Sequence, residues 1–229
     1  MKWDPEPFGA DGSYSLIPML VGSICSSILA VIIATPIALC TAVGVFAAKL
    51  NFIKTIVHLL AGIPSVVFGL WGLNTIVPLV NSIHPPGASL ISGALVLSIM
   101  IAPVIILTTL SALEALPEEL YNAGAALGIN TLKIVFKILI PAASQSIISG
   151  IILALARAFG ETMALLMVCG NIAQLPKSIF DPVLTLTTVI ALEMGYSYGN
   201  HTQALYIAGT ALLSIVLVMI IFTRKVLKP

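Results

Sequence analysis

Long apolar stretches separated by short polar segments dominate the chain from residue 16 to residue 222. A helix needs roughly 20 apolar residues to cross a bilayer. Five stretches reach that length, within Leu16–Ala48, Thr55–Val80, Ala88–Ala112, Ala142–Gly170 and Gln203–Phe222. They run on without the alternation of β-barrel strands. The pattern therefore predicts an all-α integral membrane protein with about five transmembrane helices.

One part-polar island, Leu116–Pro141, interrupts this pattern. Pro117 suits a first helical turn, Gly128 suits a helix stop, and Asn130 or Thr131 suits the next cap. Two short amphipathic helices are expected, whose apolar stripes are Leu116, Leu120, Ala123 and Leu127, then Leu132, Val135, Phe136 and Leu139. Such a loop predicts a surface for a partner outside the membrane. A helix lying on lipid headgroups is the alternative.

Composition supports a membrane protein and narrows its chemistry. Hydrophobic residues make up 59% of the 229 residues and charged residues only 8%, against about 25% charged in soluble domains. The net charge of +1 and the absence of a Lys/Arg-rich patch argue against a nucleic-acid partner. The three cysteines and three histidines lack metal-ligand spacing, so no metal site is expected. No phosphate-binding GxxxxGK[ST] loop occurs, so this chain is not expected to hydrolyse ATP.

The positive charges predict the orientation, because cytoplasmic loops of membrane proteins are enriched in Lys and Arg. With the amino terminus outside, the cytoplasmic segments hold seven, namely Lys49, Lys54, Lys133, Lys137, Arg224, Lys225 and Lys228. The outer segments hold two, Lys2 and Lys177. We expect an external segment 1–15, then one transmembrane domain 16–229. The loop at about 114–141 and the carboxyl terminus should face the cytoplasm, in a multi-pass protein of the cell membrane.

Arg157 and Glu161 lie inside the fourth predicted span, four residues apart and so expected on one helical face. A charged side chain at mid-membrane costs about 2.5–3.5 kcal/mol, so it indicates a functional site by default. The planar guanidinium of Arg157 suits a carboxylate or a tetrahedral oxyanion, and Glu161 would hold it in position. A structural pair that only joins two helices is the alternative.

A second candidate site lies in the second span, where Pro64 removes a backbone hydrogen bond and Ser65 can bond a freed carbonyl. This predicts a kinked gate, with ordinary packing of small residues as the alternative. Between Asn171 and Thr202, the piece Val183–Leu192 is too short to span and predicts a re-entrant or interfacial helix.

The island resembles the "EAA" loop of ABC-transporter permeases, which runs E-A-A, three residues, G, nine residues and I-x-L-P. Here Asn122, Ala123 and Gly124 precede Gly128, and Ile138–Pro141 follows at the same spacing. The chain departs from the pattern with Asn122 for Glu, Gly124 for Ala and Ile140 for Leu. These departures bear on details of the ATPase contact.

Further motifs resemble phosphate-specific permeases, PstC type, over nearly the whole chain. They are WDPEPFG, AGIPSVVFGLWG, LSIMIAP, ALPEEL, ALG and RAFGETMALLMVCGN, with a Thr-rich piece at Thr185, Thr187 and Thr188. Members of this family usually have six spans, with one helix before the WDPEPFG segment. This chain begins at that segment, so either this member lacks the first helix or the given sequence starts downstream of the native start. The resemblance implies a MetI-like, type I ABC importer fold, of which the five-helix core is present.

The resemblance also implies partners. A second, PstA-like permease would complete the path, and an external PstS-like protein would deliver phosphate. A PstB-like ATPase dimer would hold ATP and Mg²⁺, while this chain binds no cofactor. Arg157 and Glu161 would line the path, and the residues that couple to the ATPase would be Glu118, Glu119, Asn122, Ala123, Gly124 and Gly128.

Two alternatives stay open on the residues alone. An Arg fork fits molybdate, tungstate or sulfate as well as phosphate. A proton-coupled secondary transporter would use Glu161 as a relay, but such proteins often show inverted repeats, and none is visible here. The loop at Leu116–Pro141 also has no role in that alternative.

Overall fold

The structure, a computed structural model, describes residues 3–5 and 12–226, and the side chains only up to residue 223. Residues 1–2 and 6–11 of the predicted external segment, and part of the WDPEPFG motif, lie outside the described residues. The elements are β1 (Trp3–Asp4), β2 (Ser13–Tyr14), α1 (Ile17–Ala48), α2 (Asn51–Ala61), α3 (Ser65–Ile83), α4 (Leu90–Glu114), α5 (Glu118–Ala126), α6 (Thr131–Ile134), the π-helical η1 (Val135–Leu139), α7 (Ile140–Ala142), α8 (Ser144–Phe159), α9 (Met163–Val168), α10 (Leu186–Glu193) and α11 (Asn200–Val226).

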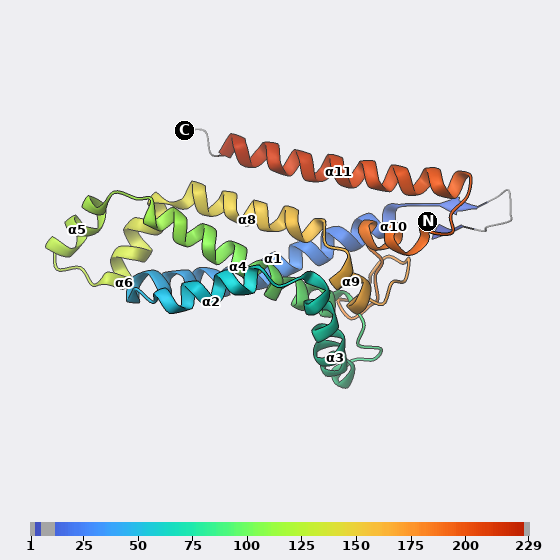
Figure 1. The fold of residues 1–229 in the computed structure, drawn as a ribbon, viewed down its shortest axis with the longest axis horizontal. Helices are drawn as coiled ribbons and strands as arrows, with labels where there is room; N and C mark the ends of the chain where they lie inside the picture. The colour runs from blue at the N-terminus through green and yellow to red at the C-terminus, as the bar shows by residue number, and fades with distance from the viewer. Residues whose placement is uncertain (1–2, 6–11, 227–229) are drawn as a thin grey trace.

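Four helices, α1, α4, α8 and α11, run along the long axis of the molecule (Figure 1). At one end, the loop end, lie α5 and α6. At the other, the hairpin end, lie α10 and the antiparallel pair of β1 and β2. The most extensive contact in the bundle is that between α1 and α4. Ala30, Ala34, Ala38 and Ala42, all buried, form one stripe of α1 and let the two backbones approach closely.

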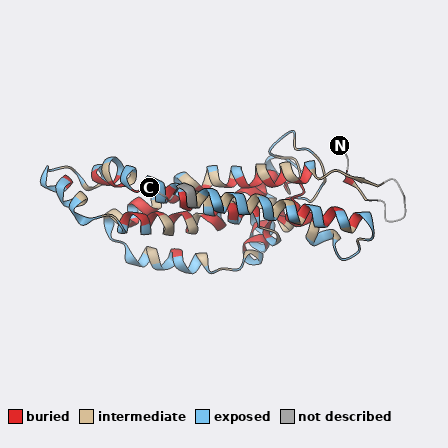
Figure 2. Ribbon diagram, turned by 90° about the horizontal axis from the view of Figure 1, so that it is seen from above, coloured by how far each residue is buried: buried red, intermediate tan, exposed pale blue. Residues whose placement is uncertain are grey.

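The number of helices able to cross a membrane agrees with the prediction of about five. By length and composition, α1, α3, α4 and α11 qualify, and a fifth span results if the bent pair 131–142 and 144–159, with an angle of 75°, counts as one. α1 stays helical through Pro36 over 32 residues. Much of the surface of α11 is exposed (Figure 2), as expected of a helix that faces lipid or another subunit.

The predicted second span, Thr55–Val80, is wrong as a single helix. α2 ends at Ala61 and α3 begins at Ser65, and Pro64 at the start of α3 has an extended ψ of 140°. The residue before a proline is disfavoured in the α conformation, so the helix stops there. α2 runs beside α1 and α4, whereas α3 turns away from the long axis (Figure 1).

The predicted fourth span, Ala142–Gly170, is also broken. α8 ends at Phe159 with Gly160 as its cap, and α9 covers only Met163–Val168. The apolar run gave no sign of this break, because hydropathy averaged over about 19 residues stays high across one glycine and two polar residues. α9 packs mainly on α3, away from the axis of α8.

The contact between α3 and the bundle leaves no room for a side chain at Gly72. A Cβ there would lie 2.4 Å from Cγ2 of Val96 on α4, and Val96 is fully buried. We therefore expect Gly72→Ala to lower the free energy of unfolding by about 1–3 kcal/mol, as overpacking does. The thermal midpoint of the purified protein in detergent measures this.

Gly44→Ala is the matched control, because a Cβ on Gly44 of α1 meets no described atom within 4 Å. Alanine there should be neutral or stabilising by up to about 1 kcal/mol, since glycine is the poorer helix former. Equal shifts in the two variants would contradict the tight contact between α3 and α4.

Candidate functional site

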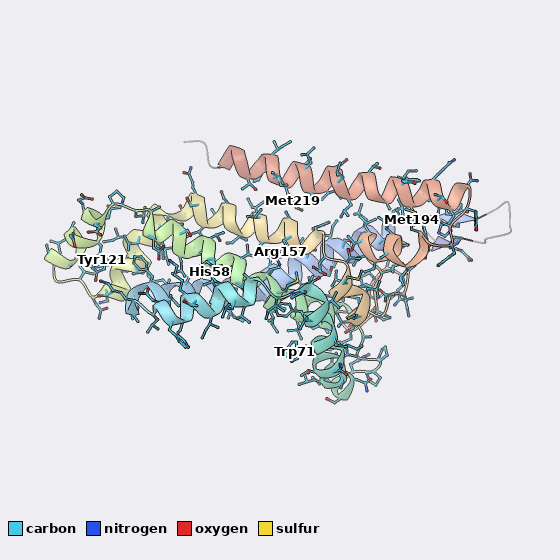
Figure 3. The ribbon with its side chains drawn as sticks, in the orientation of Figure 1. His58, Trp71, Tyr121, Arg157, Met194 and Met219 are labelled. Carbon is cyan, nitrogen blue, oxygen red and sulfur yellow. The ribbon has the colours of Figure 1, made fainter. Side chains whose placement is uncertain are left out.

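Arg157 lies in the last turn of α8, about midway along the molecule (Figure 3). Its side chain is exposed, and it makes no hydrogen bond or ion pair with any residue that the structure describes. A guanidinium at this depth of an apolar bundle is costly unless water, another subunit or a ligand meets it. Within the described residues, Arg157 is therefore free to meet water, another subunit or a ligand.

The expected ion pair between Arg157 and Glu161 is absent among the described residues. Because α8 stops at Phe159, the two side chains do not share one continuous helical face. Glu161 instead accepts a hydrogen bond at Oε1 from the backbone N–H of Ala164, at 3.1 Å, and so caps the start of α9. The spacing of four residues predicted the pair only on the assumption of an unbroken helix.

The backbone of Glu161 is held by α10, a contact that spacing along the chain did not predict. Thr187 donates from Oγ1 to the carbonyl oxygen of Glu161 at 2.7 Å. The start of α10 is in turn fixed by a capping box between Thr185 and Thr188, and by Ser23 of α1, whose Oγ accepts from Leu186 N at 2.9 Å. The short piece after Val183 is thus a short helix buried at its first turn, and it positions Glu161.

The predicted gate residues, Pro64 and Ser65, lie at the start of α3, the helix that packs on α9. Pro64 is exposed and Ser65 is half-buried. The hydroxyl of Ser65 has no hydrogen-bond partner in the described part of the chain, so the expected bond to a freed carbonyl is wrong. The reason is that α2 ends before Pro64 and α3 begins after it, so there is no kinked helix whose carbonyl needs a new partner. α3 packs on α9 through Gly69, where a Cβ would lie 2.9 Å from Cα of Ala164.

The predicted loop of two helices broken at a glycine is confirmed. α5 begins after Pro117, Gly128 has a φ of +71° with no packed neighbour, and Asn130 Oδ1 accepts from Leu132 N at 2.9 Å. Glycine is therefore required at position 128 by its left-handed backbone conformation and not by a close neighbour. Five of the predicted coupling residues are exposed, namely Glu118, Glu119, Asn122, Ala123 and Gly128.

Gly124 differs from those five because it is buried. A Cβ at this position would come 2.9 Å from Cγ1 of Ile134, so glycine allows α5 to lie close to α6. Glycine replaces the alanine of the EAA pattern here because Ile134 of the same loop leaves no room for a Cβ. Gly124 sets the angle between the two loop helices and is not part of their outer surface.

The apolar stripes predicted for the loop hold only in part. Val135 and Leu139 are buried, but Leu127 is 78% exposed, Leu132 51% and Phe136 53%. Leu127 lies at the cap that ends α5, and Val135–Leu139 forms a π-helical turn, which breaks the 3.6-residue period by which Phe136 was placed. Leu127, Leu132 and Phe136, which we call the apolar tip, leave an apolar surface at the loop end.

At the hairpin end, the connection from α9 to α10 is closed by Asp181. Its Oδ2 accepts from Lys177 N at 2.7 Å and from Ser178 N at 2.9 Å. These backbone donors, that of Ser178 first, lower the pKa of the Asp181 carboxyl below its ordinary 3.8, so it is ionised at neutral pH. Among the described residues, no three His, Cys, Asp or Glu side chains gather as metal ligands.

This fold matches that of a solved transporter chain. A chain of the MetNI methionine ABC transporter in an inward-facing conformation aligns with a TM-score of 0.74 at 18% identity, covering 93% of this chain and 96% of that one. At this identity the match supports the architecture alone. The predicted MetI-like permease fold is confirmed.

Three relatives align over nearly all of the chain. The probable ABC transporter permease protein YqgH of Bacillus subtilis is 36% identical, over 98% of this chain and 74% of its own. The phosphate transport system permease protein PstC of Pasteurella multocida is 32% identical, over 97% and 76%. The probable phosphate transport system permease protein PstC of Methanocaldococcus jannaschii is 32% identical, over 95% and 76%.

A family profile agrees with these relatives. It covers residues 34–228, from α1 through the exposed loop and the broken fourth span to α11. The match thus includes Arg157, Glu161 and the whole region predicted to dock a partner. This chain is a multi-pass membrane protein that belongs to the family of binding-protein-dependent transport system inner membrane components.

Proposed function

We propose that this chain is the transmembrane permease subunit of an ATP-driven phosphate importer, in which it forms half of the path and couples to a separate ATPase. The proposal rests on Arg157. Its guanidinium is permanently charged and has no partner among the described residues, and the chain is similar to phosphate permeases. A tetrahedral oxyanion offers the paired acceptor oxygens that this fork binds.

In this mechanism Arg157 meets the anion for a short time only, because conduction requires release as well as binding. Glu161 lies at the break between α8 and α9 and does not neutralise Arg157, so the guanidinium stays available to the anion. After the break, α9 begins with its first turn bonded to Glu161, and α9 packs on α3, the helix that starts at Pro64 and Ser65. Movement of α3 would then open or close the path beside the anion.

ATP and Mg²⁺ belong to the ATPase partner in this proposal, and the exposed loop is its docking element. Leu127, Leu132 and Phe136 supply apolar area, and Glu118, Glu119 and Asn122 supply polar contacts around it. An interface with an apolar centre and a polar rim has this composition. The loop end faces the cytoplasm, in accord with the positive charges of its loops.

The remaining partners complete the path. A second permease subunit would cover exposed apolar residues of α3 such as Val67, Leu70 and Trp71. An external binding protein would deliver phosphate at the hairpin end, where β1, β2 and α10 lie. These assignments follow the family, whose description names a binding protein, and the similar Bacillus subtilis protein, whose name places it in an ABC transporter.

Uptake by the assembled complex tests the proposal. Proteoliposomes containing the permease pair and the ATPase, with the binding protein outside, should accumulate radiolabelled phosphate only when ATP is inside. Excess sulfate, molybdate or tungstate should not compete. If no phosphate were taken up but one of these oxyanions accumulated with ATP, that oxyanion would be the substrate. Uptake driven by a proton gradient without ATP would indicate a secondary transporter.

A further inference from the structure

An ion pair joins α2 to the end of α4 at the point where the docking loop begins. Nζ of Lys54 lies 2.7 Å from Oε1 and 2.9 Å from Oε2 of Glu114. Glu114 is the last residue of α4, and Pro117 opens the loop three residues later. Lys54 is the fourth residue of α2. The pair therefore connects the base of the loop with a helix that precedes it by some 60 residues.

Neither charge is placed to stabilise its own helix. A base near the amino end of α2 and an acid at the carboxyl end of α4 both oppose the dipoles of the helices that carry them. Among the described residues, each charge has its ion-pair partner in the other, across the two helices. The ion pair thus holds α2 against α4 and does not help either helix to form.

A cleft of about 490 Å³ lies between α5 and α2, and the ion pair is at its edge. Its walls include Asn51 and Lys54 on one side and Glu118, Tyr121 and Asn122 on the other. α5 packs on α6 and η1, whereas α2 packs on α4. A displacement of the loop that moves the end of α4 therefore reaches α2 by way of the pair of Lys54 and Glu114, in addition to the packing of α2 on α4.

The far end of α2 leads to the candidate path. α2 stops at Ala61, the chain breaks through Pro64, and α3 follows and packs on α9. α9 is the helix whose start Glu161 caps. Two rigid helices separated by a break can pass a displacement at one end to the other, because packed helices do not deform continuously.

We propose that Lys54 and Glu114 are positioning residues that carry movement of the docking loop to α2 and α3, and so couple ATP hydrolysis to opening beside Arg157. This rests on the proposed function. Both side chains are partly exposed, 33% for Lys54 and 47% for Glu114. Such pairs add little to stability, so variants that lack the pair should fold and assemble while transport becomes uncoupled.

The test measures phosphate molecules transported per ATP hydrolysed by the reconstituted complex. Lys54→Met and Glu114→Gln should each lower this ratio by about twofold to thirtyfold, the range for changes within a coupling network, with ATPase association unchanged. The double variant Lys54→Glu with Glu114→Lys restores the pair with reversed charges and should recover most of the ratio. Lys49→Met is the matched control, because Lys49 lines the same cleft without an ion pair to any described residue.

Several results would overturn the inference. One is a wild-type ratio in Lys54→Met. Another is a reversed pair that stays as uncoupled as the single variants, since each charge would then act alone. Loss of assembly in both single variants, recovered by the reversed pair, would make the contact structural. Failure of the wild type to move phosphate with ATP would instead remove the proposed function, so the two failures are distinguishable.

Discussion

Arg157→Gln should reduce ATP-dependent phosphate uptake by the assembled complex at least about tenfold. Replacing the guanidinium by an amide removes charge-assisted hydrogen bonds to an anion, each worth about 1.5–3 kcal/mol. Assembly and basal ATP hydrolysis should persist, because Arg157 supports no described contact within the chain. Uptake of radiolabelled phosphate is measured next to ATPase co-purification in the same samples.

Leu153→Gln is the matched control for this experiment. Leu153 is 49% exposed and lies one turn before Arg157 on α8, so the variant places the same amide on nearly the same face. It should keep most of the uptake. If Arg157→Gln transported phosphate as well as Leu153→Gln does, Arg157 would be a structural residue at a subunit contact and the anion path would lie elsewhere.

Breaking up the apolar tip is expected to have the second large effect. Leu127→Asp with Phe136→Asp should weaken association of the ATPase by roughly ten- to a hundredfold or more. Burial of one such side chain is worth about 1.5–3 kcal/mol, and two carboxylates would have to be desolvated. Both residues are more than half exposed, so the fold of the permease should not change. Co-purification and ATP-dependent uptake measure the effect.

Leu175→Asp provides the comparison at the opposite end. Leu175 is 44% exposed in the connection between α9 and α10, where no ATPase is proposed to dock. This variant should retain the ATPase. Normal retention by the Leu127→Asp and Phe136→Asp double variant would mean that the apolar tip lies on lipid headgroups, the alternative that the sequence also allowed.

Short-range rules predicted those parts of this protein whose conformation depends on neighbouring residues alone. Gly128 ends α5 because only a left-handed backbone fits there, and Asn130 caps the next helix through its own side chain. The apolar runs likewise predicted α1, α4 and α11, since lipid requires apolar side chains and satisfied backbone groups whatever the fold. The EAA spacing identified the loop on the same local basis.

The candidate site could be predicted only as a list of residues. Arg157 and Glu161 were found because charge is rare in an apolar run, but their relation was not, since α8 stops at Gly160. The bond from Thr187 to Glu161 spans 26 residues and that from Lys54 to Glu114 spans 60, so no local pattern contains either. Whether a charge is paired, capping or free depends on which helices pack together. That packing is set by contacts such as Gly72 on Val96 and Gly124 on Ile134, between residues distant enough in the chain that no periodicity relates them.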